Sequence, residues 1–160
     1  MILRVAACTL FLAVWICPAL SAQMQCDVQS IRGTWAYNYQ GSVILPDVPQ
    51  PVPIVMLGVA SIDAQGRMTA PGTAIMGGQL LDFEMVNVTL DVKPDCTLTA
   101  KWGLKAKGAP ASFPGQGIDR CVIIPQGNEF QCTSIQGVLG KPIYIGVFKR
   151  IHAVPTAVAW

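Results

Sequence analysis

Apolar and polar residues alternate along most of the chain beyond residue 33, with the period of half-buried β-strands. The segment 34–43 places three aromatic residues on one face and small or polar residues on the other. Residues 86–92 and 96–105 alternate in the same way. No segment has a helical period of useful length. The pattern therefore predicts an all-β fold.

Turn signals divide this pattern into eight short strands. We expect strands at 34–43, 53–62, 67–75, 79–92 and 96–105, two more on either side of Gln126-Gly127, and the last at 142–151. Eight consecutive strands favour an antiparallel up-and-down barrel, with room inside for a side-chain core or one small ligand. An open β-sandwich is the alternative.

The connections between these strands predict one closed and one open end. Short turns at 63–66, 93–95 and 126–127 belong to one end. The long connections 41–53 and 106–117 belong to the other, which we expect to be loop-rich and open. Binding sites collect on such loops. The 106–117 loop is interpreted either as a lid with Phe113 at its apolar tip or as a disordered insertion.

The N-terminal segment 1–22 has the layout of a secretory signal peptide. Arg4 precedes an apolar run, and small residues follow it. The run is too short for a membrane span, although an N-terminal anchor is the alternative. The prediction divides the chain into a signal peptide, a barrel domain at 23–151 and a C-terminal tail at 152–160. The mature protein is then secreted or lies in the lumen of the secretory pathway.

Four of the six cysteines lie outside that segment, and an even number in an exported chain indicates two disulfides. Three pairings are possible. We favour Cys121–Cys132, across a hairpin, together with Cys26–Cys96.

Charge and composition exclude several classes of function. Charged residues make up 12% of the chain. Without Arg4, ten of the eleven basic residues remain against nine acidic ones. This balance, without a basic run, argues against nucleic acid as a partner. No apolar stretch after the signal is long enough for a membrane span. With His152 as the one histidine and no CxxC motif, we expect neither a metal nor a cofactor.

The sequon Asn87-Val88-Thr89 predicts a glycan at Asn87. A glycosylated Asn87 faces outward, and strict alternation then turns Asp82 and Glu84 into the barrel near its open end. Acidic groups there need a partner or a shifted pKa. Alternatively, a β-bulge between residues 84 and 86 turns both acids outward.

The same alternation brings further side chains to the open end. Arg120 and Tyr144 are the candidate catalytic hydrogen-bond donors, and Arg120 is the expected partner of the acids. Tyr39 and Trp102 are expected to line the substrate site, together with Asp82, Glu84 and Phe113. Trp35, at the start of the first strand, is interpreted as a structural plug of the closed end. A homodimer is also expected, through an outward apolar patch of Leu81, Phe83 and Met85.

Short motifs resemble known barrel families. The segment Ile31-Arg-Gly-Thr-Trp-Ala-Tyr resembles the Gly-x-Trp start of lipocalin-type barrels. Gly58…Ile62-Asp63…Gly66-Arg67 and Asp95-Cys96-Thr97 are similar to segments of small secreted barrels of the allene-oxide-cyclase-like kind. With its size, signal peptide and cysteines, the chain resembles the fungal hetero-Diels–Alderases of tropolone–sesquiterpenoid biosynthesis. The resemblance fixes no catalytic residue.

The resemblance implies an enzyme that joins a tropolone quinone methide to a humulene-type terpene, so that its partners are small hydrophobic polyketide and terpene substrates. Such a cycloaddition needs two apolar reactants held in one orientation and a hydrogen-bond donor on a carbonyl. The chain has no Gly-x-Ser-x-Gly motif and no phosphate loop. Two alternatives stay open: a secreted lipocalin-like carrier of a small hydrophobic ligand, and a secreted interaction protein with a filled barrel.

Overall fold

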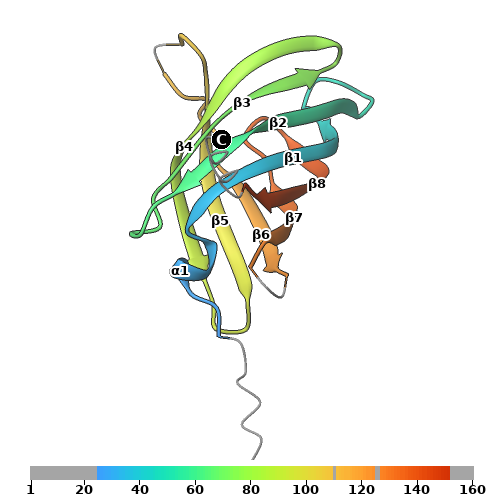
Figure 1. The fold of residues 1–160 in the computed structure, drawn as a ribbon. Coiled ribbons are helices and arrows are strands. Elements are labelled where there is room, and N and C mark those ends of the chain that lie inside the picture. The colour runs from blue at the N-terminus through green and yellow to red at the C-terminus, as the bar shows by residue number, and fades with distance from the viewer. Residues whose placement is uncertain (1–24, 110, 125–126, 152–160) are drawn as a thin grey trace, which may run out of the picture.

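The computed structural model describes residues 25–109, 111–124 and 127–151. Its eight strands form a closed antiparallel barrel in which each strand pairs with the next and β8 closes on β1 (Figure 1). The strands are β1 (Gly33–Ile44), β2 (Val52–Ile62), β3 (Met68–Met76), β4 (Gln79–Val92), β5 (Thr97–Ala106), β6 (Gly117–Ile123), β7 (Glu129–Gln136) and β8 (Lys141–Arg150). The predicted up-and-down barrel is confirmed.

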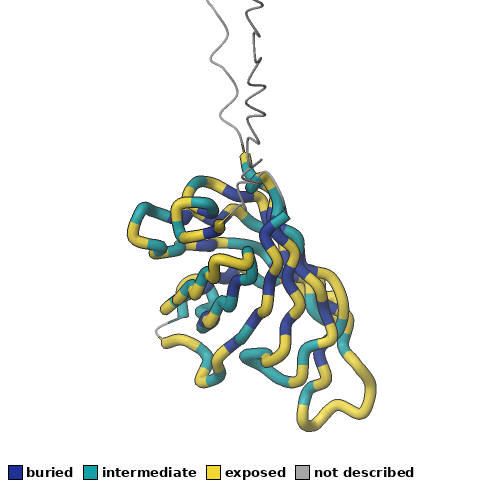
Figure 2. Tube along the Cα trace, turned by 90° about the horizontal axis from the view of Figure 1, so that it is seen from below, coloured by how far each residue is buried: buried dark blue, intermediate teal, exposed yellow. Residues whose placement is uncertain are grey.

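Buried and exposed residues alternate along the strands, as Figure 2 shows. On β1, the aromatic side chains of Trp35, Tyr37 and Tyr39 are all buried, while the residues between them are more exposed. This alternation is what the pleat of a strand imposes when one face meets a core. The inward faces of all eight strands contribute to one apolar core.

A bulge interrupts the alternation on β4. The register against β5 shifts between Val86 and Thr89, and Asn87 has a positive φ of 54°. An extra residue at a bulge reverses which face the following residues occupy. Phe83 before the bulge and Leu90 after it therefore both pack on the core.

The bulge decides the outcome for three sets of predicted residues. Asp82 and Glu84 are exposed, so the expectation that they face the lumen is wrong. The alternative with a bulge gave the correct faces, but the bulge lies between Val86 and Thr89 and not between residues 84 and 86. Phe83 and Met85 are buried, and Leu81 is only half-exposed. These three residues therefore do not form the expected outward patch. The large apolar side chains that are exposed include Leu57, Ile75, Leu80, Ile143 and Ile145.

The closed end of the barrel, the floor, is built around Trp35, as expected. Its ring is fully buried, and its Nε1 donates to the carbonyl of Ile31 (2.8 Å). Ile31 ends α1 (Val28–Ile31), a short helix that the sequence pattern did not reveal and that Asp27 caps. The Arg150 guanidinium lies 4.4 Å from the centre of the Trp35 ring. Arg150 also donates to backbone carbonyls of Ser30, Arg32 and Gly127, which ties the helix, β8 and the β6–β7 turn together.

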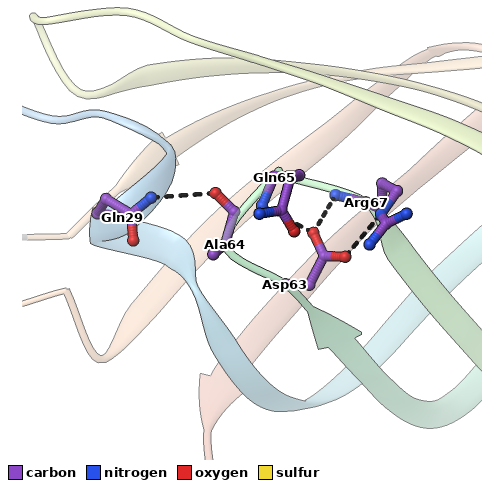
Figure 3. A network of polar contacts seen from close by, with 5 residues as sticks. All are labelled: Gln29, Asp63, Ala64, Gln65 and Arg67. Carbon is purple, nitrogen blue, oxygen red and sulfur yellow. Dashed lines mark hydrogen bonds and ion pairs between the residues drawn. The ribbon is translucent and has the colours of Figure 1, made fainter.

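The β2–β3 turn completes this end of the molecule (Figure 3). Asp63 accepts hydrogen bonds from the backbone N–H groups of Gln65 and Arg67, and its second oxygen accepts from Arg67 Nε (2.7 Å). The hydrogen bond from the Arg67 backbone is the largest cause of the lowered pKa of Asp63. Gln29 of α1 donates to the carbonyl of Ala64 (3.1 Å). The turn thus holds the helix against the floor.

Two disulfides join Cys26 to Cys96 and Cys121 to Cys132, the pairing that the sequence analysis favoured. The first attaches the segment before α1 to the β4–β5 turn, and the second links β6 to β7. Disulfides are typical of proteins that fold in an oxidising compartment, and these two bonds are compatible with such a location. The predicted signal peptide (1–22) and C-terminal tail (152–160) lie outside the described residues.

Asn87 is exposed at the bulge, and Thr89, the third residue of its sequon, is exposed as well. We predict that it carries an N-linked glycan when the chain is expressed in a eukaryotic secretory pathway, because the amide is presented to solvent. Enzymatic deglycosylation should lower the mass of the wild-type protein. Asn87→Gln should have the lower mass from the start. A wild-type mass that deglycosylation leaves unchanged would contradict the prediction.

Candidate functional site

Three side chains from different strands form a polar cluster inside the barrel. Tyr39 of β1 donates through its hydroxyl to Asp119 Oδ2 (2.6 Å), and Trp102 of β5 donates through Nε1 to the same oxygen (3.0 Å). All three side chains are buried, with Asp119 only 1% exposed. We call Tyr39, Trp102 and Asp119 the lumen cluster. Its centre is the carboxyl group of Asp119, which lies among mostly apolar and aromatic side chains.

The sequence analysis identified Tyr39 and Trp102 but chose the wrong member of the next pair. Arg120 is exposed on the outer face of β6, whereas Asp119 points inward. The two cysteines of the Cys121–Cys132 disulfide are buried and stand opposite each other in the β6–β7 register, so their face of β6 is the inner one. Asp119, two residues before Cys121, shares its face. The spacing of two residues between Asp119 and Cys121, with the disulfide placed on the inner face, is the sequence signal that could have identified Asp119.

One carboxyl oxygen of Asp119 is left without a partner. Oδ2 accepts both hydrogen bonds of the lumen cluster, but Oδ1 is buried and has no hydrogen-bond partner of good geometry. Ser134 stands opposite Asp119 in the β6–β7 register, and its hydroxyl is turned to the carbonyl of Gln136 (3.4 Å). An unsatisfied buried acceptor is costly, so this oxygen favours a proton or a donor.

Burial is the main cause of the raised pKa of Asp119, because the charged form loses its hydration. Side-chain hydrogen bonding from Tyr39, Ser134 and Trp102 opposes the rise only in part. The interior therefore favours the neutral carboxylic acid more than water does.

Tyr144 of β8 lies next to this group. Its ring meets that of Tyr39 edge to face, with the ring centres 5.7 Å apart. Burial raises the pKa of Tyr144 to about 12. Hydrogen bonding with Ser134 lowers this pKa, and the nearby charge of Asp119 raises it further. Burial likewise raises the pKa of Tyr39 well above its usual value. Both hydroxyls therefore keep their protons at neutral pH.

The aromatic rings of the lumen lie against glycines on the neighbouring strand. Tyr39 stands opposite Gly146 on β8, and Trp102 stands opposite Gly117 on β6. A Cβ atom at either glycine would overlap the ring. The rings thus occupy the space that the missing side chains leave free, and this contact fixes where the hydrogen-bonding edge of each ring points.

Two small cavities lie in the lumen among the described residues, and the Trp102 ring lines both of them. The cavity toward the loop-rich end has a volume of about 30 Å³ and reaches Tyr144, Met56 and Leu139. The cavity toward the floor, of about 20 Å³, reaches Asp119, Tyr39 and Phe130. Either volume suits about one water molecule. A larger ligand has to displace side chains before it enters.

Loop side chains cover the loop-rich end. Val138 and Leu139, between β7 and β8, line the upper cavity, and they pack against the core together with Phe113. We call Phe113, Val138 and Leu139 the cap. Phe113 is held by its backbone N–H, which donates to the carbonyl of Leu104 (2.8 Å). The end expected to be open is therefore loop-rich but closed by three apolar side chains.

Asp82 and Glu84 lie instead on an outer groove of about 660 Å³. Val59, Phe83 and the 105–109 segment also line this groove. Thr73 donates to Asp82 (2.9 Å), and Lys107 lies 3.9 Å from it. The groove is separate from the lumen cluster, so the structure does not bring the two acids together with Tyr39, Trp102 or Tyr144.

Within the described ranges, no group of three or more His, Cys, Asp or Glu side chains is placed to hold a metal ion. The described segments also contain no helix that is both long and apolar enough to span a membrane. No family model matches the chain, and neither the curated proteins nor the solved structures contain a match to it.

Proposed function

We propose that the protein is a secreted hetero-Diels–Alder cyclase that joins a tropolone quinone methide to a humulene-type terpene within the loop-rich half of the lumen. The observation that carries the proposal is the lumen cluster with Tyr144 beside it, a group of hydrogen-bonding side chains in a mostly apolar, aromatic interior. The resemblance of the chain to fungal hetero-Diels–Alderases in size, signal peptide and cysteines supplies the reaction.

The proposed reaction conserves every atom of the two reactants. The O=C–C=C unit of the quinone methide adds across one C=C bond of the terpene. One C–O and one C–C bond form, three π bonds become one, and no proton or electron leaves. The enzyme has to orient the partners and polarise the carbonyl. Tyr144 is the donor candidate, and the Trp102 ring is a wall for stacking.

The closed cap has a consequence for this proposal. Ligand pockets usually have volumes of roughly 300–1,000 Å³, far above the about 30 Å³ of the upper cavity. The reactants can enter only when Phe113, Val138 and Leu139 move outward. The glycine-containing loops that carry these side chains are suited to such a movement.

The test is product formation from a quinone-methide precursor and a humulene-type alkene, with and without the protein. We expect the wild type to raise the rate and to fix one stereochemical outcome. Tyr144→Phe should lower the rate roughly 10–100-fold, the size of effect expected when one transition-state donor is lost. Arg120→Ala is the matched control and should leave the rate unchanged, because Arg120 lies on the outer face.

Wild-type protein that changes neither rate nor stereochemistry would remove the cyclase proposal. Retention of the terpene or the tropolone without conversion would instead identify a carrier of small hydrophobic ligands. A Tyr144→Phe variant as fast as the wild type would remove only the assignment of Tyr144.

A further inference from the structure

Asp119 of β6, Ser134 of β7 and Tyr144 of β8 are buried on three neighbouring strands of the barrel. Ser134 stands opposite Asp119 in the β6–β7 register. Thr133 pairs with Ile145 in the β7–β8 register, which brings Ser134 beside Tyr144 as well. Hydrogen bonding with Ser134 lowers the pKa of Asp119 and of Tyr144, which agrees with this placement. Tyr144 in turn lines the upper cavity, whose other lining residues are apolar except for the Trp102 ring. The indole N–H of Trp102 is already bound to Asp119.

The direction of hydrogen bonding along the chain of Asp119, Ser134 and Tyr144 depends on the proton of Asp119. Oδ2 accepts from Tyr39 and Trp102, so a proton on the neutral acid belongs on Oδ1, the oxygen without a partner. Asp119 then donates to Ser134, the Ser134 hydroxyl turns from the Gln136 carbonyl to donate to Tyr144, and the Tyr144 proton is free for a ligand. When Asp119 is ionised, Oδ1 draws the Ser134 proton, and Tyr144 donates to Ser134 instead.

We propose that Asp119 is a positioning residue which, through Ser134, sets whether the Tyr144 hydroxyl donates into the upper cavity, and that the ligand of this cavity presents a carbonyl oxygen to Tyr144. The proposal rests on the proposed function for the location of the site. It adds the polar group of the ligand and the control of the donor.

Asp119 is the group in this cluster whose change of protonation can make carbonyl binding depend on pH, because its neighbours keep one protonation state between about pH 5 and pH 9. Tyr39 approaches from β1 and Tyr144 from β8, and burial keeps both neutral. Trp102 and Ser134 do not titrate in this range, and Cys121 and Cys132 are joined in the disulfide. Because burial raises the pKa of Asp119, the neutral acid persists to higher pH than in an exposed aspartate. Carbonyl binding is expected below that pKa and is lost as the pH rises through it.

The test uses tropone, a seven-membered cyclic ketone without a titrating hydroxyl, as the carbonyl probe. Cycloheptatriene, the hydrocarbon of the same ring size, is the control probe. Affinity is measured by calorimetry from about pH 5 to pH 9, in the wild type and in a Leu139→Ala background that enlarges the upper cavity. We expect tropone affinity to fall about tenfold, one lost hydrogen bond, as the pH rises. Cycloheptatriene affinity should stay constant.

Three variants separate this relay from a structural role of Asp119. Asp119→Asn keeps the acceptor for Tyr39 and Trp102 and supplies a permanent N–H donor to Ser134, so it should bind tropone with the low-pH affinity at every pH. Ser134→Ala breaks the chain and should abolish the pH dependence. Tyr144→Phe should bind tropone about tenfold more weakly at low pH. Thermal melts identify any variant that fails to fold. If Asp119→Asn does not fold, Ser134→Ala alone tests the relay.

Several results would overturn the inference. Tropone affinity that does not change with pH in the wild type contradicts the control by Asp119. A pH dependence retained in Ser134→Ala contradicts the relay. Failure of tropone to bind even in the Leu139→Ala background contradicts the carbonyl site. The proposed cyclase fails separately, when no rate increase accompanies the wild-type protein, whatever the tropone titration gives.

Discussion

Trp35→Ala is expected to lower the free energy of unfolding by about 3–5 kcal/mol, the range for a large buried aromatic side chain. The ring is fully buried, contacts Phe130 edge to face at 4.8 Å, and lies beneath the Arg150 guanidinium. Its loss also leaves the Ile31 carbonyl without its indole donor. The floor thus loses packing, a hydrogen bond and the surface under a cation at once.

Urea unfolding with both disulfides intact measures this effect. Thr34→Ala is the matched control, because Thr34 is the exposed neighbour on the same strand. We expect it to change the stability by less than about 0.5 kcal/mol. A Trp35→Ala protein as stable as the wild type would show that Trp35 does not hold the floor together.

Removal of the Cys26–Cys96 disulfide is expected to have an effect of similar size. The cysteines are 70 residues apart, and the entropy of closing a loop of that length in the unfolded chain corresponds to about 4 kcal/mol. The Cys121–Cys132 bridge spans 11 residues, which corresponds to about 3 kcal/mol. The longer bridge also holds the segment that leads into α1, whose Ile31 supplies the carbonyl partner of Trp35.

The two double cysteine-to-serine variants should therefore differ in order as well as in size. Chemical unfolding of Cys26→Ser with Cys96→Ser is expected at lower denaturant concentration than that of Cys121→Ser with Cys132→Ser. The reverse order would mean that the buried environment of the second bridge outweighs the loop-length effect. Mass spectrometry under non-reducing conditions should find no free thiol in the wild type.

The strand pattern was sufficient to predict the barrel because alternation and turn residues act locally. The strand boundaries observed for β1, β2 and β5 differ from the predicted ones by at most one residue at either end. The short helix α1 was missed because four residues are too few to show a helical period. Its signal was the cap, where Asp27 and Ser30 exchange hydrogen bonds with each other's backbone.

The candidate site was predicted less well, because which face a strand turns inward depends on irregularities that alternation alone does not locate. The bulge at Asn87 moved Asp82 and Glu84 to the outside. On β6, the sequence analysis assigned the wrong alternate residues to the inner face. It therefore placed Arg120 in the lumen, where Asp119 lies. Tyr39, Trp102 and Tyr144 were placed correctly in the lumen, since their strands run without interruption through them. The roles assigned to all these residues remain predictions.

The contacts between rings and glycines have a consequence for how this barrel can change over evolutionary time. Tyr39 and Gly146 lie on different strands, as do Trp102 and Gly117, but the two residues of each pair share one volume. A larger residue at either glycine is tolerated only after the ring opposite has become smaller. In homologous sequences we therefore expect each glycine and its ring to be lost together. Pairs that have exchanged size would mark the lineages in which the interior was reshaped for a different ligand.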